Sequence, residues 1–298
     1  MRRVWMILIV VAGVGLGLAA TEYGRATATQ RQTVVFNLRP ARLAPDDLEI
    51  GGDLPGLPAG STRYLTRNDL LGLPQEHYTV SDDSNFTSSV EVAGVALADL
   101  AQRLGAESKA VVAICNDKYQ AYYRGAYLTA HHPVLVLDVN GRGPAEWPKD
   151  PGGNAMGPYL ISHANFTPSF KILSHVEEAQ IPWGVVRLEF RDENAVFSAI
   201  AARGSHASDL EVQAGFKIAQ ENCFRCHNMG TEGGHKAGLS WAALARFAAT
   251  RPVVFGAYVR NPQAANPRAQ MSGSPDYDDA TISALVAYFK TFSSQEKP

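Results

Sequence analysis

The pentapeptide Cys223-Phe-Arg-Cys226-His227 restricts the possible structures of this chain more than any other feature. It holds two of the three cysteines in the 298-residue sequence. A disulfide between Cys223 and Cys226 is one account of the pair. A thioredoxin-like redox site is another, but it requires a βαβ context, and the residues that follow have the pattern of helix and loop. A zinc site would need a second pair of ligands, and no other Cys lies nearby in the sequence.

Two cysteines at this spacing, followed directly by a histidine, form the attachment signature of c-type haem. The two thiols would form thioether bonds to the haem vinyl groups, and the adjacent imidazole would bind the iron. We therefore predict one covalent haem c, attached through Cys223 and Cys226, with His227 as an axial ligand of the iron.

The residues before this motif predict a helix that leads into it. Ser208 and Glu211 have the spacing of a capping box, which marks a helix start. The apolar residues Val212, Phe216 and Ala219 then recur with helical periodicity towards the motif. An amphipathic helix is therefore expected to deliver the two cysteines.

The residues after the motif also have helical patterns. Residues 240–249 and 252–260 predict two short helices, and Asn261-Pro262 should end the second. Asp278 and Asp279 are positioned to cap a last helix, whose apolar residues recur on one face. From residue 208 onward, the chain is therefore expected to be all-helical.

The iron would need a sixth ligand, and Met271 is the methionine best placed to supply it. It lies in the Pro-rich segment 261–275, which we expect to be non-helical and able to cross the opposite face of the haem. His235, eight residues after His227, is the alternative, because haem proteins use both His/Met and bis-His ligation. We predict His227 and Met271 as the axial pair.

From Ser208 to the end, the chain resembles the class I cytochrome c family. The resemblance is carried by Gly215, the Cys223–His227 motif, the loop from Asn261 to Met271, and a last helix with Tyr288 and Phe289. It implies electron transfer by haem and close contact between the first and last helices at Gly215.

Two departures from the family pattern matter. Position 219 is Ala where the family often has an aromatic residue. The segment HKAGLSW, residues 235–241, lacks the proline whose carbonyl normally accepts the proton of the haem-binding histidine. The hydrogen-bond partner of His227 is therefore left open by the sequence.

The first 200 residues predict a mixed α/β structure. Residues 33–38, 110–115, 133–141 and 183–190 have the apolar patterns of strands, and residues 95–105 include a helix. From about Asp47 to Phe190, the order of short segments resembles the molybdopterin-binding domain of the sulfite oxidase family. The segments are LEIGGDLPGLPAG, NDLLGLP, VALADLAQRLG, ICNDKYQAYY, PVLVLDVNGR and MGPYLI.

The resemblance also exposes a missing ligand. The family's molybdenum-binding cysteine would fall between Pro74 and Gly94, and this interval contains no Cys. Ser81 or Asp82 would be hard oxygen replacements for a soft thiolate. Cys115 lies one segment later, at the end of an apolar strand, where we expect a buried small hydrophobe. We therefore predict no molybdenum cofactor.

The N-terminus predicts export. Arg2 and Arg3 precede an uncharged apolar run from Val4 to Ala20, as in a signal sequence. Because this run is close to the minimum length of a membrane span, residues 1–28 are either a cleaved signal peptide or an N-terminal anchor. The mature chain is expected in the periplasm or on the extracytoplasmic face of the membrane.

Composition completes the prediction. The chain is 46% hydrophobic with a net charge of -2, and it has no basic run suited to nucleic acid. We predict a multidomain chain: residues 33–195 as the molybdopterin-binding-like α/β domain, 196–207 as linker, and 208–298 as the cytochrome c domain. It would transfer electrons and dock through the first domain on a redox partner protein or membrane respiratory complex. The alternative is a molybdenum oxidoreductase that passes substrate electrons to its own haem.

Overall fold

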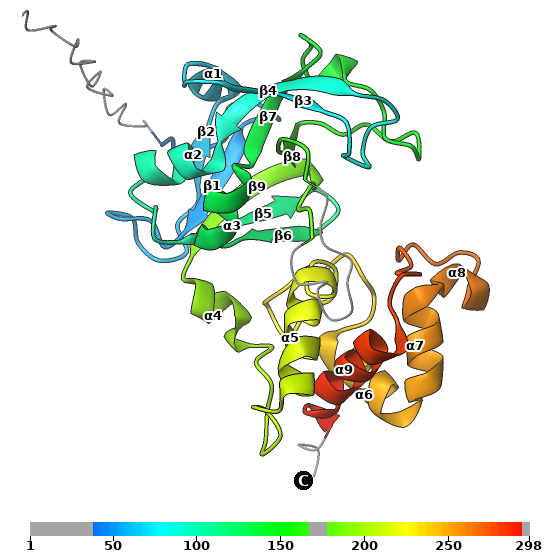
Figure 1. The fold of residues 1–298 in the computed structure, drawn as a ribbon. Helices are drawn as coiled ribbons and strands as arrows, with labels where there is room; N and C mark the ends of the chain where they lie inside the picture. Colours follow the sequence, from blue (N-terminus) through cyan, green and yellow to red (C-terminus); the bar gives the residue numbers. More distant parts are fainter. Residues whose placement is uncertain (1–37, 167–177, 294–298) are drawn as a thin grey trace, which may run out of the picture. The chain divides into compact units, whose positions relative to one another are not determined.

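A computed structural model describes residues 38–166 and 178–293, and these residues belong to one compact unit. The fold is mixed α/β, as the sequence predicts (Figure 1). A sheet is built by the first part of the chain, here called the sheet part (residues 38–191). Every named element after it is a helix, and residues 193–293 are here called the helical part. The predicted signal or anchor, residues 1–28, lies outside the described residues.

Nine strands of the described residues form one sheet, in which β9 pairs with three others, β1, β5 and β8. The strands are β1 (Leu48–Gly52), β2 (Arg63–Leu65), β3 (Glu76–Val80), β4 (Val90–Ala96), β5 (Ala110–Cys115), β6 (Gln120–Tyr123), β7 (Val134–Val139), β8 (Tyr159–Ser162) and β9 (Trp183–Arg191). The order is β2-β1-β9-β8-β7-β4-β3, with β5 also paired to β9 and β6 paired to β5. Only the β1–β9 pair is parallel among these described strands.

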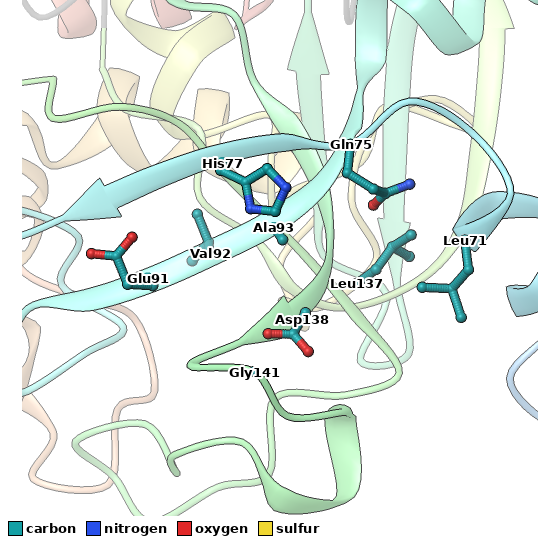
Figure 2. A pocket seen from close by; sticks show the side chains of 9 residues that line it. All are labelled: Leu71, Gln75, His77, Glu91, Val92, Ala93, Leu137, Asp138 and Gly141. Atoms are coloured by element: carbon teal, nitrogen blue, oxygen red, sulfur yellow. The ribbon is translucent and has the colours of Figure 1, made fainter.

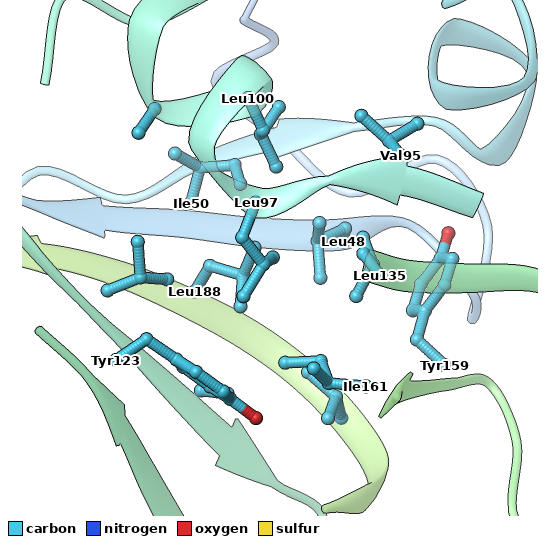
Figure 3. Packing of buried hydrophobic residues seen from close by; sticks show 14 of the residues in the cluster. Leu48, Ile50, Val95, Leu97, Leu100, Tyr123, Leu135, Tyr159, Ile161 and Leu188 are labelled. Atoms are coloured by element: carbon cyan, nitrogen blue, oxygen red, sulfur yellow. The ribbon is translucent and has the colours of Figure 1, made fainter. Parts of the chain in front are cut away.

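Short helices accompany the sheet. They are α1 (Arg67–Leu71), α2 (Leu97–Arg103), α3 (Gly125–His131) and the 3-10 helix η1 (Pro144–Glu146), and α4 (Glu193–Ser198) begins the helical part. The leucines of α2 are fully buried with Leu48 and Ile50 of β1 and Leu188 of β9, and Figure 3 shows these side chains meeting. The apolar segments predicted as β5, β7 and β9 and the helix at α2 are confirmed. The strand expected at residues 33–38 lies almost entirely outside the described residues.

The helical part contains α5 (Leu210–Asn222), α6 (Trp241–Thr250), α7 (Pro252–Arg260), α8 (Pro262–Ala265) and α9 (Asp279–Lys290). The four helices predicted from periodicity are present. The short α8 was not expected, since segment 261–275 was predicted to be non-helical. Asn261 ends α7 but also caps α8, because its side chain accepts from the backbone N–H of Ala264.

The predicted capping box of α5 is wrong, whereas the cap of α9 is confirmed. Helix α5 starts one residue later, with Asp209 at the cap position and no side-chain cap bond among the described residues. The carboxylate of Glu211 instead accepts from Ser283 Oγ on α9 at 2.6 Å. Asp278 caps α9 by accepting from the backbone N–H of Thr281 at 2.8 Å.

Helices α5 and α9 touch where α5 has no side chain. A Cβ added to Gly215 would lie 2.0 Å from the carbonyl oxygen of Ala284 and 2.8 Å from Cβ of Tyr288. Tyr288 is fully buried, and its hydroxyl donates to the carbonyl of Ile200 at 2.5 Å. The close approach expected at Gly215 is therefore confirmed, and it fixes the direction in which α5 points at its C-terminal end.

None of the helices within residues 38–166 and 178–293 has the length and apolar character needed to cross a membrane.

Substitution of Gly215 tests this packing. In an ordinary helix interior, Gly→Ala stabilises by about 1 kcal/mol. Here the added methyl group would overlap the α9 backbone, so we expect Gly215→Ala to lower the free energy of unfolding by about 1–3 kcal/mol, the range for overpacking. Urea unfolding measures this. The control is Gly238→Ala, where the added Cβ meets no described heavy atom within 4 Å. An unchanged or increased stability of Gly215→Ala would contradict the proposed contact.

Candidate haem-attachment site

The Cys223–His227 motif forms a tight turn at the C-terminal end of α5. Cys223 is the C-cap residue, and its backbone N–H donates to the carbonyl of Ala219 at 2.9 Å. The N–H groups of Cys226 and His227 both donate to the carbonyl of Cys223, at 3.1 and 3.0 Å. The turn therefore brings the two cysteines and the histidine together. Both thiols are free.

The environment of the thiols argues against redox chemistry of their own. Burial raises the pKa of the Cys223 thiol to about 12 and also raises the pKa of Cys226. The negative end of the α5 dipole lies at Cys223, where it disfavours a thiolate. Disulfide oxidoreductases need a cysteine whose pKa is lowered. The pair therefore lacks the lowered pKa that a disulfide-exchange site needs.

A backbone carbonyl fixes the ring of His227. Its side chain is buried, and Nδ1 lies 2.6 Å from the backbone carbonyl oxygen of Leu239. Because a carbonyl oxygen only accepts, Nδ1 carries the proton and Nε2 keeps its lone pair for a metal. Burial lowers the pKa of His227, which favours the neutral imidazole. The Leu239 carbonyl thus occupies the position for which the sequence offered no proline.

An apolar core surrounds the motif. Phe224, inside the motif, is fully buried and packs against Trp241 of α6 with ring centroids 5.4 Å apart. Helices α7 and α9 add buried aromatic residues to the same cluster. Cys223 and Met271 are partly buried against it. The two sequence-predicted residues therefore border one apolar region, as a haem group would require.

The two candidates for the sixth ligand differ in their surroundings. Met271 lies beyond the end of α8, and its carbonyl accepts from Gln263 Nε2 at 2.9 Å, which fixes the loop. His235 is exposed, and its backbone N–H donates to the carbonyl of Lys118 in the sheet part at 3.0 Å. This hydrogen bond holds His235 against the sheet part.

A conventional multi-ligand metal centre does not occur in the described part of the chain. Residues 38–166 and 178–293 contain no group of three or more His, Cys, Asp or Glu side chains that could hold a metal ion. These described residues therefore bring no further ligands to Cys223 and Cys226 to complete a zinc site. A haem needs only axial ligands from the protein, so the donor set fits it.

The sheet part contacts the motif directly, which sequence reasoning missed. The hairpin formed by β5 and β6, residues 110–123, is here called the hairpin. The backbone N–H of Gln120 donates to the carbonyl of Arg225, inside the motif, at 2.9 Å. Tyr122 stacks on Phe224 with ring centroids 5.4 Å apart. No periodicity or motif signals such contacts, because they join segments about 100 residues apart.

Ion pairs extend this junction. Arg191 at the end of β9 makes two bonds to Glu232, at 2.7 and 3.0 Å. Lys236 lies 2.6 Å from the carboxylate of Asp117 in the hairpin turn. The loop after His227 is therefore anchored to the sheet part at both of these points.

The segment between Pro74 and Gly94, where the resemblance would place a molybdenum ligand, has no cysteine, and its polar side chains bond to other residues. Ser81 accepts from Asn165 Nδ2 at 2.6 Å, so its hydroxyl is used in a local contact. The neighbouring Asp83 is buried, and it accepts from Ser162 Oγ at 2.8 Å. Cys115 is buried at the end of β5, as expected, and burial raises its pKa far above the ordinary value.

The described sheet carries a shallow pocket of about 370 Å³ on strands β3, β4 and β7. Figure 2 shows His77, Glu91 and Asp138 among the residues that line it. None of the nine described residues that line it is a cysteine. The pocket therefore offers no soft ligand for a metal such as molybdenum.

Comparison with protein-family models finds no match for the chain, and comparison with curated proteins finds no match either.

Proposed function

We propose that the protein is an exported c-type cytochrome that transfers electrons through one covalent haem c. The observation that carries this proposal is the geometry of His227. Its Nδ1 proton is bound by the Leu239 carbonyl, and its Nε2 lone pair remains for iron, next to two free, half-buried cysteines. In this proposal, Cys223 and Cys226 attach the haem, and the helical part is its all-α cytochrome c domain.

The bound haem would supply reversible one-electron chemistry at its iron. The residues of the chain would hold and shield it. The turn at the end of α5 positions the cysteines beside His227, and the buried aromatic side chains of the helical part exclude water. A buried, low-dielectric surrounding is one of the main ways in which a protein tunes a haem potential.

Met271 is proposed as the second axial ligand. Its partial burial against the aromatic core and the anchoring of its loop by Gln263 support this assignment. His235 is the weaker candidate, because its backbone is bonded to the sheet part and its side chain is exposed. A methionine ligand would raise the reduction potential.

The sheet part is proposed to be a cofactor-free, molybdopterin-binding-like domain. The interval between Pro74 and Gly94 has no Cys, and Ser81 is engaged with Asn165. Such a domain would serve as a docking scaffold on a redox partner protein or a membrane respiratory complex outside the cytoplasmic membrane. We do not favour a molybdenum oxidoreductase, since the thiolate that its metal would need is missing from this interval.

Substitution of the attachment cysteines tests the covalent bond. In the exported full-length chain, we expect haem to stay with the protein on a denaturing gel, detected by its peroxidase activity. Cys223→Ala with Cys226→Ala should abolish this band, because no thioether can form. Cys115→Ala is the matched control, and it should keep the band. A wild-type chain that loses all haem on denaturation would refute covalent attachment.

Substitution of the candidate axial ligands tests the sixth position. Met271→Ala should remove the weak sulfur-to-iron absorption near the red end of the spectrum and lower the reduction potential, because the thioether ligand is lost. His235→Ala should change neither property. The reverse pattern, in which only His235→Ala alters the spectrum, would show that the assignment is wrong.

A further inference from the structure

The second variable residue of the attachment motif, Arg225, has a side chain that faces the sheet part instead of solvent. Its Nη1 lies 3.4 Å from the hydroxyl oxygen of Tyr119, in the turn of the hairpin. Its Nε and Nη2 atoms are buried and have no hydrogen-bond partner in the described structure. The guanidinium is thus enclosed but largely unpaired.

Backbone contacts hold Arg225 in this position. Gln120 of β6 donates its N–H to the Arg225 carbonyl at 2.9 Å, and Gly234 lies so close that an added Cβ would come within 3 Å of the Arg225 carbonyl carbon. Lys236 pairs with Asp117 at 2.6 Å on the rim of the same hairpin. The hairpin therefore covers the motif on the side where Arg225 points.

A guanidinium in this position stays charged. Arginine is effectively always protonated in proteins, and its desolvation without full pairing costs free energy. Two acidic groups near it, Glu221 and Glu178, interact favourably with its charge and offset part of this cost. The fold keeps a permanent positive charge within one residue of Cys226 and two of Cys223.

This charge acts on both attachment cysteines. The positive charge of Arg225 interacts with both cysteines, and at Cys226 it adds to the charge of Lys236. Charges interact more strongly in a buried, low-dielectric environment than at the surface, and they are less screened by salt. A group bound at these two sulfurs would experience the same field.

We propose that Arg225 is a fixed internal charge that raises the reduction potential of the haem c held by its neighbours, and that the hairpin maintains this effect by keeping the charge buried. Reduction adds one electron from the redox partner to the ferric iron and removes one positive charge from the site. A nearby guanidinium repels the ferric state more than the ferrous state, so it favours reduction. The inference rests on the proposed function and gives the sheet part a role in setting the potential.

Potentiometry on the exported, full-length protein tests the proposal. Arg225→Gln should lower the midpoint potential relative to wild type, whereas Arg225→Lys should retain most of it. The matched control is Arg246→Gln, which removes the same charge from an exposed position on α6. The small shift in midpoint potential caused by Arg246→Gln should vanish at high salt, while the shift caused by Arg225→Gln should persist. An Arg225→Gln potential equal to or above wild type, at normal haem content, would overturn the proposal.

If Arg225→Gln does not fold, a second variant, which removes a negative charge near Arg225, provides the test. Glu221 lies on α5 with its carboxylate 3.1 Å from Gln180 Nε2, and its charge opposes that of Arg225. At about pH 9, where carboxyl groups are ionised, Glu221→Gln should raise the potential, and a lowered or unchanged value would contradict the inference. Haem staining distinguishes failure of the proposed function from failure of this inference. A wild-type chain without covalent haem would contradict the proposed function. Variants that carry haem but have the wild-type reduction potential would contradict only this inference.

Discussion

The contact between the hairpin and the Cys223–His227 turn is the constraint on which the rest of the structure depends. Two backbone hydrogen bonds, from Gln120 to Arg225 and from His235 to Lys118, join segments that are distant in sequence. Separation of the two segments would break both of these hydrogen bonds, so the bonds favour the contact. The turn that presents both thiols and His227 is therefore held from outside the helical part.

Apolar packing also joins the sheet part to the helical part. Val112 of β5 and Tyr122 of β6 belong to the same apolar cluster as the buried residues of α5, α6 and α9. The predicted linker, residues 196–207, contributes Val196, Phe197 and Ile200 to this cluster. An apolar core that spans the sheet part, the linker and the helices favours cooperative unfolding. Under the proposed function, the sheet part on which a partner would dock packs directly against the helices that would hold the haem.

The sequence predicted those features that have local signatures. Helical periodicity found α5, α6, α7 and α9, and apolar runs found β5, β7 and β9. Haem attachment, inferred from the Cys-x-x-Cys-His spacing, stays a prediction. Gly215 was correctly interpreted as a close contact, because only a missing side chain permits the approach of α9. The capping box failed because Glu211 bonds to Ser283 on α9, a tertiary partner that competes with the local one.

Other features could not be predicted, for physical reasons. The partner of His227 is a backbone carbonyl, which every residue carries, so Leu239 has no side-chain signature. The environment of Arg225 depends on Tyr119 and Gln120, about 100 positions earlier, and no periodicity links them. The pairing of β9 with three other strands likewise depends on which strands meet in space.

Metal analysis of the purified, exported chain tests the central claim most directly, because one measurement checks both the proposed haem iron and the proposed absence of molybdenum. The account predicts one iron atom per chain, which remains after denaturation and gel filtration, and no molybdenum. Molybdenum in equal amount to iron, or a chain without iron, would contradict it.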